Sequence, residues 1–122
     1  MKQAKEKIIM GIDPGIASVG YGIIKKTGKE ISLIDYGCIR TYAGDDHIVR
    51  LRDIYRELKR IIQKNKPDTV AVEELFFAKN VKTALKVGEA RGVILYTIIQ
   101  QKISFCEFTP PVSYTHLTLP TN

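Results

Sequence analysis

The sequence predicts an α/β fold in which three antiparallel strands are followed by alternating helices and strands. Three apolar, strand-like runs come first and are joined by short links, which is typical of β-hairpins. Two segments with the periodicity of amphipathic helices follow, and each precedes a further short apolar run. This order implies one mixed sheet with helices packed on it.

The three hairpin strands are expected in three apolar runs, at residues 7–13, 19–26 and 30–41. The first run is apolar on both faces until Asp13, which is typical of a central strand covered on both sides. Pro14 and Gly15 end that strand, and a polar turn with a glycine at 26–29 separates the other two.

Two helices are expected, the first after Asp45 or Asp46 as N-cap and the second from Asn80 as N-cap to about residue 102. The first helix carries apolar residues at helical spacing, namely Ile48, Leu51, Ile54, Leu58, Ile61 and Ile62. The second has a face of apolar or small residues, namely Val81, Ala84, Leu85, Gly88, Gly92, Leu95, Ile98 and Ile99. The remaining strands are expected at residues 69–74 and 103–108.

Length and charge narrow the class of protein. The 122 residues fit one domain, and the net charge of +6 favours an anionic partner such as nucleic acid, although a basic surface on a small soluble protein is equally compatible. The charged start of the chain is not a signal peptide and no long apolar run occurs, so we expect a cytoplasmic protein without a membrane segment. Cys38 and Cys106 stand in apolar, strand-like runs and are expected to be buried, reduced thiols.

The last segment, 109–122, differs from everything before it. It contains three prolines and no charged residue, and it shows neither a helical face nor a clean strand. We therefore expect one domain over 1–108, followed by an atypical tail that does not belong to it.

Two carboxylates are the first candidates for chemistry. Asp13 and Glu73 each end an apolar strand, and if the two strands are neighbours both side chains emerge at one edge of the sheet. Such a pair could share a hard cation such as Mg²⁺ or Mn²⁺. The alternative is that the acids only mark the start of solvated loops. Glu74 should point to the other face by strand alternation.

A second candidate site surrounds the start of the second helix. Phe76 and Phe77 directly follow the acid pair and could stack on unpaired bases, although at least one could be ordinary core. A basic set could bind the phosphate backbone or could be a solvated helix face: Lys79, Lys82, Lys86 and Arg91. Small residues four apart on one helix stripe allow close helix approach, either to the chain's own sheet or across a dimer seam: Ala84, Gly88 and Gly92.

Several blocks of the sequence resemble the RuvC family of Holliday-junction resolvases, the crossover junction endodeoxyribonucleases. Two of them lie in the predicted hairpins: IMGIDPG at 9–15 with GYG at 20–22, and GCIRT at 37–41. The two most specific are VEELFFAKN at 72–80 and ALKVGEARG at 84–92. The blocks occur in the family's order over residues 8–108.

The resemblance implies a ribonuclease H-like fold and a homodimeric endonuclease that nicks four-way DNA junctions in recombination and repair. It implies Mg²⁺ as cofactor, a branch-migration helicase complex as partner, and Asp13 and Glu73 as catalytic and metal-binding acids. It assigns Phe76 to the opened junction centre and the 84–92 helix to the dimer interface. Within the VEELFFAKN block we also expect Asn80 to bind DNA.

One departure from the family is expected to matter. The family supplies two more active-site acids from a later helix, and this sequence has no Asp or Glu after Glu107. We therefore expect a C-terminally truncated resolvase with impaired cleavage. The alternatives are a non-catalytic DNA-binding or dimerisation fragment, a related ribonuclease H-like RNA-processing nuclease, and an actin-like phosphate-binding fragment.

Overall fold

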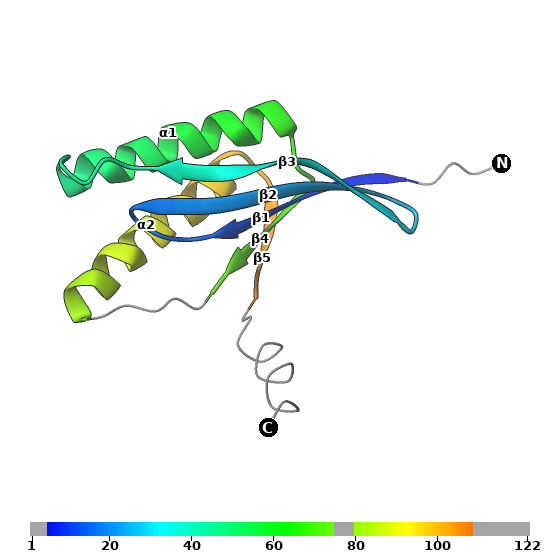
Figure 1. Ribbon diagram of the computed structural model, residues 1–122. Helices are drawn as coiled ribbons and strands as arrows, with labels where there is room; N and C mark the ends of the chain where they lie inside the picture. The colour runs from blue at the N-terminus through cyan, green and yellow to red at the C-terminus, as the bar shows by residue number, and fades with distance from the viewer. Residues whose placement is uncertain (1–4, 75–79, 109–122) are drawn as a thin grey trace, which may run out of the picture.

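The computed structural model of the chain describes residues 5–74 and 80–108. These residues form one five-stranded sheet and two helices (Figure 1). The strands are β1 Glu6–Asp13, β2 Ser18–Thr27, β3 Glu30–Arg40, β4 Thr69–Glu73 and β5 Ser104–Phe108. The helices are α1 His47–Asn65 and α2 Val81–Gln100.

The sheet has the strand order β3-β2-β1-β4-β5. The β1–β2 and β2–β3 pairs are antiparallel, whereas β1–β4 and β4–β5 are parallel. The predicted mixed sheet of three hairpin strands followed by alternating helix and strand is thereby confirmed. Because β1 is the central strand and β4 is its parallel neighbour, the last residues of these two strands lie side by side.

Both helices begin at the predicted caps. The Asp46 side chain accepts a hydrogen bond from the Ile48 backbone N–H at 3.0 Å, and the Asn80 side chain accepts one from the Thr83 N–H at 2.9 Å. Each bond satisfies a backbone donor that has no partner inside the helix. At the other end of α1, Lys66 takes a left-handed conformation with φ 49°, and its N–H donates to the Ile62 carbonyl.

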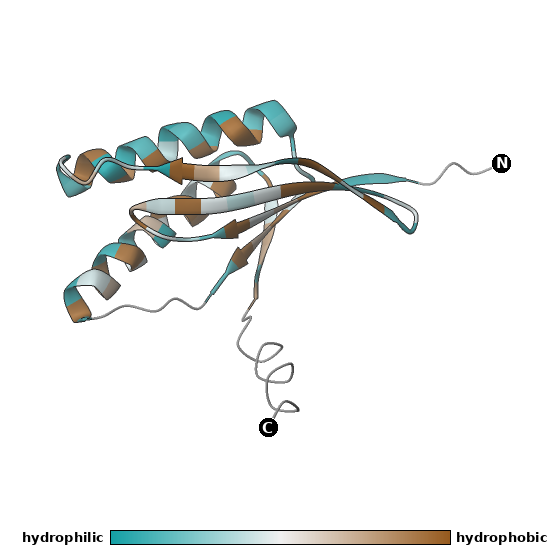
Figure 2. Ribbon diagram, viewed as in Figure 1, coloured by the Kyte–Doolittle hydropathy of each residue, from teal (hydrophilic) through white to brown (hydrophobic). Residues whose placement is uncertain are grey.

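The helices cover one face of the sheet. Met10 and Ile12 of β1 and Val70 and Val72 of β4 are at most 2% exposed, and they belong to one cluster with buried residues of α1 and α2. Figure 2 shows the apolar residues recurring along α1 with polar residues between them. Since side chains alternate along a strand, Asp13 and the residues of β1 and β4 next to the core positions face away from the helices.

The prediction of which face of α2 is buried was wrong. Its buried residues are Val87, Ala90, Ile94, Thr97 and Ile98, so only Ile98 of the predicted apolar face is buried. Val81 is 74% exposed and Leu85 is 64% exposed. The prediction chose the wrong face because α2 is apolar on more than one side, and the side that contains Val87 and Ala90 is the one that faces the core. In α1, likewise, Ile48 is exposed.

The two cysteines are also not where the sequence led us to expect them. Cys38 pairs with Gly20 across β2–β3, Cys106 pairs with Ala71 across β4–β5, and both thiols are exposed. Their strand neighbours Ile39 and Phe105 belong to the core or pack against it. The prediction of buried thiols was wrong because apolar strand composition does not reveal which face is covered.

Candidate metal and nucleic-acid site

Asp13 and Glu73 meet at one edge of the sheet. Ile12 of β1 pairs in parallel with Val72 of β4, so the next residue of each strand is one of the two acids. Both carboxylates line a pocket of about 240 Å³, whose other lining residues are Gly11, Ile12, Gly20, Tyr21, Gly22 and Phe108. The predicted convergence of the two side chains is therefore present in the structure.

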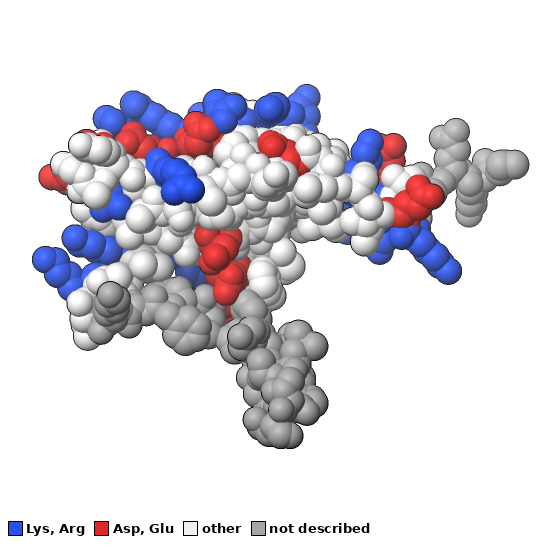
Figure 3. All heavy atoms as spheres, viewed as in Figure 1, with Lys and Arg blue, Asp and Glu red and all other residues white. Residues whose placement is uncertain are grey.

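The two acids influence each other electrostatically. The pKa of Glu73 is raised above its ordinary value, first by partial burial, then by the negative charge of Asp13 and by a side-chain hydrogen bond with Asp13. Figure 3 shows acidic side chains gathered together on the face in view, below the basic side chains that run along α1. A cation placed between the carboxylates would offset their repulsion.

Three of the residues beside the carboxylates are glycines, namely Gly11, Gly20 and Gly22. Gly20 lies across from Asp13, and a Cβ at Gly20 would stand 3.7 Å from the Asp13 Cβ. A Cβ at Gly11 or Gly22 would meet no atom within 4 Å. These glycines therefore leave room for a large molecule to approach the carboxylates from the face that the helices do not cover.

The loop that follows Asp13 is tightly folded. A Cβ on Gly15 would lie 2.3 Å from the Ser18 carbonyl oxygen, so only glycine fits at this position. The loop is held from β3, since the Thr41 N–H donates to the Ala17 carbonyl at 3.1 Å.

Two side-chain hydrogen bonds that the sequence analysis missed also hold this loop. The Thr41 hydroxyl donates to the Ile16 carbonyl at 2.5 Å and accepts from Arg50 Nε at 2.9 Å. Thr41 stands in the GCIRT block, but nothing local in the sequence connects it to the loop 25 residues earlier. Only the return of β3 to the edge of the sheet that carries Asp13 brings the two segments together.

The structure describes only some of the residues that were predicted to bind DNA. Phe76, Phe77 and Lys79 lie outside the described residues. Lys82 is exposed and Lys86 is half-buried on α2, while the Asn80 amide oxygen is used as the helix cap. Among these residues, the described ones lie at the start of α2 or in its first turns.

Arg91 makes an intramolecular ion pair. Its Nη2 lies 2.7 Å from Glu107 Oε2 on β5, and its side chain is only 17% exposed. Arg91 Nε and Nη2 donate no hydrogen bond of good geometry to the described residues. The contact with Glu107 is therefore an ion pair more than a directed hydrogen bond. A DNA contact by Arg91 stays a prediction, and it would have to compete with Glu107.

The small-residue stripe of α2 does not pack on the chain's own sheet. Gly88 and Gly92 are exposed, a Cβ on either would meet no atom within 4 Å, and Ala84 is half-buried. Next to the stripe, a groove of about 460 Å³ runs between α1 and α2. The apolar and aromatic residues that line it are Ile48, Leu51, Tyr55, Val93 and Tyr96. Of the two interpretations of the stripe, close packing on the chain's own sheet is therefore not observed among the described residues.

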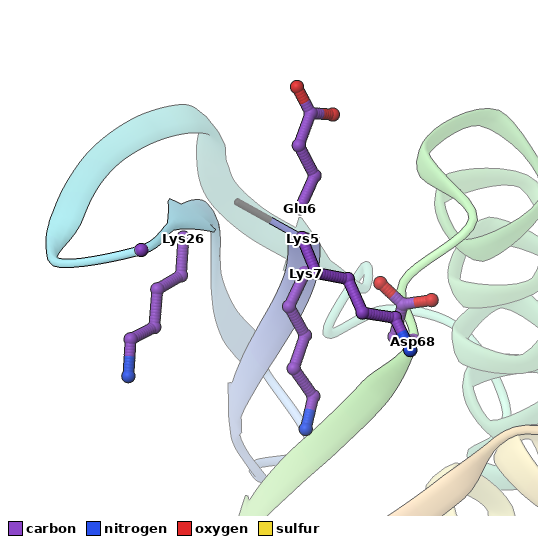
Figure 4. A pocket seen from close by; sticks show the side chains of 6 residues that line it. Lys5, Glu6, Lys7, Lys26 and Asp68 are labelled. Atoms are coloured by element: carbon purple, nitrogen blue, oxygen red, sulfur yellow. The ribbon is translucent and has the colours of Figure 1, made fainter. Parts of the chain in front are cut away.

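A second pocket lies at the opposite end of β1. It measures about 420 Å³ and is lined by Lys5, Glu6, Lys7, Lys26, Gly28 and Asp68. The lysine ammonium groups are spread apart and do not point to a common centre (Figure 4). Asp68 is already used, because its Oδ2 accepts the Ile8 N–H at 2.7 Å. We therefore place no binding site there.

The donor set at the carboxylate edge fits a hard divalent cation. Residues 5–74 and 80–108 contain no group of three or more acidic, histidine or cysteine side chains arranged for a metal, so the candidate ligands there are Asp13 and Glu73. Asp13 and Glu73 could form part of a Mg²⁺ site, because this ion commonly binds through one or two carboxylates, keeps several waters and takes further oxygens from a phosphate. Partial burial and the charge of Asp13 both raise the pKa of Glu73, and a cation bound there would offset the second of these causes.

A five-stranded mixed sheet in this order, with both helices on one face, defines a ribonuclease H-like fold. The family model described as "Crossover junction endodeoxyribonuclease RuvC" matches residues 9–116. The chain belongs to the RuvC family. The match runs past residue 108, where we expected the domain to end, so that boundary and the separate tail stay predictions.

The relatives agree with this assignment. The chain is 54% identical over 103 residues to crossover junction endodeoxyribonuclease RuvC of Caldicellulosiruptor saccharolyticus, covering 84% of this chain and 62% of that protein. The structure matches Thermus thermophilus RuvC in complex with Holliday junction substrate with a TM-score of 0.77 and 27% identity, covering 84% of this chain and 66% of that one. The yeast mitochondrial Holliday junction resolvase Ydc2 shares the fold, with a TM-score of 0.70 at 14% identity. The chain thus spans less than two thirds of the length of these RuvC relatives.

Neither described helix combines the length and the hydropathy needed to cross a membrane.

Proposed function

We propose that this chain carries the carboxylate site of a metal-dependent endonuclease that nicks four-way DNA junctions. The observation that carries the proposal is the meeting of Asp13 and Glu73 on the uncovered face of the sheet, with a raised pKa at Glu73. Membership of the RuvC family supports the reaction, and the junction bound to the Thermus thermophilus relative supports the substrate class.

In this proposal Asp13 and Glu73 hold Mg²⁺ or, alternatively, Mn²⁺. The ion, when bound, polarises the phosphodiester and lowers the pKa of a water that can attack it. The chain's own part is to supply negatively charged oxygens at a fixed strand end and to leave the adjacent surface open at Gly11 and Gly22, so that a DNA backbone can come close.

The predicted DNA contacts complete the proposed substrate site. Phe76 and Phe77 would stack on bases that the junction centre leaves unpaired. Backbone phosphates would be contacted around the start of α2, beside Asn80, by Lys79, Lys82 and Lys86, and further along the helix by Arg91. The position of α2 as the next described element after β4 and Glu73 supports this arrangement.

We further propose that the active form is a homodimer joined through α2. The exposed stripe of Gly88 and Gly92 and the exposed Leu85 support this, because small residues let a second helix approach closely and apolar ones gain by burial. Two symmetric nicks in a four-way junction would need two such sites. A branch-migration helicase complex as partner and a cytoplasmic location rest on the resemblance to the family.

Binding and cleavage separate this proposal from its rivals. The chain should bind a four-way junction more tightly than a duplex of the same sequence at one salt concentration, and binding should weaken steeply with salt. Equal affinity for both DNAs would contradict the substrate class.

For cleavage, the 122-residue polypeptide should be compared with a chimera in which residues 1–108 are joined to the remaining part of the Caldicellulosiruptor relative. The two-carboxylate polypeptide should cut junctions poorly with Mg²⁺ or Mn²⁺, because too few ligands are present to control the metal, and the chimera should cut. Symmetric nicking by the polypeptide alone, abolished by Asp13→Asn, would show instead that the acids within these residues suffice.

A further inference from the structure

Three arginines lie on the β3 side of the edge that carries the carboxylates. β1 and β3 both run antiparallel to β2, so their last residues reach the same edge of the sheet. Arg40 is the last residue of β3, and α1 follows it with Arg50 and Arg56. We refer to Arg40, Arg50 and Arg56 as the arginine cluster.

The positive charge of the arginine cluster is not compensated within the described residues. The two nearby acids are taken by other arginines: Asp53 pairs with Arg52, Oδ1 to Nη2 3.2 Å, and Glu57 pairs with Arg60. The hydrogen bond from Arg60 also holds the pKa of Glu57 below its ordinary value, so this acid is firmly ionised. The two acids line a pocket of about 420 Å³ together with Cys38, Ile39, Arg40 and Arg56.

Pairing distinguishes the cluster from the chain's other described arginines. Arg52, Arg60 and Arg91 each have a carboxylate within 4.0 Å, whereas no member of the cluster does so over residues 5–74 and 80–108. Arg40 and Arg56 are exposed, and Arg50 is half-buried. An excess of positive charge therefore faces solvent on the β3 side of the sheet edge at which β1 ends.

Arg50 is held in place before any ligand arrives. Its Nε donates to Thr41 Oγ1, and the same hydroxyl donates to the Ile16 carbonyl in the loop after Asp13. The Nη groups make no hydrogen bond to the described protein, so four of the five N–H donors of Arg50 remain available. A guanidinium that is already oriented loses less conformational entropy when it binds an anion.

We propose that the arginine cluster binds a backbone phosphate of the DNA strand that enters the carboxylate site. This rests on the proposed function and adds to it a second contact point, separate from the basic residues of α2. A guanidinium matches the geometry of a phosphate with two parallel N–H···O bonds, and phosphate contacts fix the register of a strand rather than its sequence.

The distance between β3 and β1 suits a phosphate a few nucleotides away from the phosphodiester bond that would be cut. β3 and β1, whose last residues are Arg40 and Asp13, are separated by two strand spacings, roughly 10 Å, which corresponds to about three nucleotides at the axial rise of one DNA strand. The cluster would thus hold the strand on one side of Asp13, while α2 lies on the side of Glu73. Because Thr41 joins Arg50 to Ile16, the same contact also anchors the loop that follows Asp13.

The test is DNA binding by the full chain over a range of salt concentrations, in EDTA so that no cleavage occurs. Arg40→Gln and Arg50→Gln should each weaken binding about five- to tenfold and reduce the slope of log affinity against log salt by about one. Arg60→Gln is the matched control, since it removes the same charge from the same surface at a paired position, and it should change affinity less than twofold.

Two further variants separate phosphate binding from a structural role. Arg50→Lys keeps the charge but loses the planar fork, so it should retain the salt slope and bind a few-fold more weakly. Arg40 makes no hydrogen bond or ion pair that links its side chain to the described protein, so Arg40→Gln tests the proposal even if Arg50→Gln unfolds. Thermal unfolding of each variant reports whether it is folded.

The outcomes are distinguishable from those of the proposed function. If folded Arg40→Gln and Arg50→Gln have the affinity and salt slope of Arg60→Gln, the arginine cluster does not contact phosphate, although junction binding by the unmodified chain stands. If the unmodified chain binds junction and duplex equally but the variants lose slope on both, the phosphate contact stands and the junction specificity fails.

Discussion

The two ends of β1 carry similar acids and differ in how those acids are compensated. At the start of the strand, Glu6 pairs with Lys25 at 4.0 Å, and Asp68 from the neighbouring segment accepts the Ile8 N–H at 2.7 Å. At its other end, Asp13 and Glu73 have each other as the acidic neighbour, and the pKa of Glu73 is raised by partial burial and then by the charge of Asp13. The acids at one end have partners within the protein, whereas the two acids at the other end lie next to each other, where we propose that a cation binds.

The difference shows how a functional edge can be recognised in a small sheet. Asp68 stabilises the fold by occupying a backbone donor, whereas the carboxylates at the far end repel each other and cost stability until something positive binds. The pocket near Asp68 is the larger of the two, about 420 Å³ against about 240 Å³, so pocket size alone would select the wrong end.

The largest expected effect is on cleavage. In the chimera with the relative's remaining part, Asp13→Asn should reduce the rate of junction nicking at least about a hundredfold, because it removes a charge that holds the metal. Asp68→Ala, at the compensated end, should change the rate less than about twofold. Single-turnover nicking of a labelled four-way junction measures both, and equal losses would erase the contrast between the two ends.

A smaller effect should appear in stability, and in the opposite order. Asp68→Ala removes the acceptor of the Ile8 N–H and should cost about 1 kcal/mol, lowering the unfolding temperature by about 5 °C. Asp68→Asn keeps an oxygen acceptor and serves as the control, with a loss less than half as large. Thermal unfolding followed by circular dichroism distinguishes them, and no loss in Asp68→Ala would show that water replaces the carboxylate.

Much of this arrangement could be predicted from the sequence because it depends on local patterns. The strand alternation, the caps at Asp46 and Asn80, and the acids at two strand ends were all correctly placed. Parallel neighbours bring their carboxyl ends together, so the meeting of Asp13 with Glu73 followed once β1 and β4 were expected to be adjacent.

What escaped prediction depends on contacts between distant segments. The apolar face of α2 was assigned wrongly because apolar and small residues occur on several sides of that helix, and only packing on the sheet selects Ala90 and Ile94. The pairing of Arg91 with Glu107 and the relay from Arg50 through Thr41 join residues whose proximity follows from the register of β3 and β5. No spacing rule in the sequence encodes these contacts.

Metal binding gives a third test of the uncompensated end. At a concentration about ten times its dissociation constant, Mg²⁺ should stabilise the folded chain by about 1.4 kcal/mol and raise the unfolding temperature by several degrees. Asp13→Asn should lose this rise, and Asp68→Asn should keep it. An equal rise in all three proteins would mean that the ion binds elsewhere.

The smallest expected effect is on the pH dependence of the metal-free chain. The folded pKa of Glu73 lies above its ordinary value of 4.5, so the ionised carboxylate destabilises the fold. This penalty is complete above the folded pKa and disappears as the pH falls below 4.5, since Glu73 is then protonated in both states. Asp13→Asn removes the neighbouring charge, so in EDTA it should raise the unfolding temperature at pH 7 by about 2 °C, well under 1 kcal/mol for a partly exposed group. The gain should shrink towards zero near pH 4. A variant that is less stable than the unmodified chain at pH 7, or a gain that does not change with pH, would show that repulsion between Asp13 and Glu73 is not what distinguishes this end of the sheet.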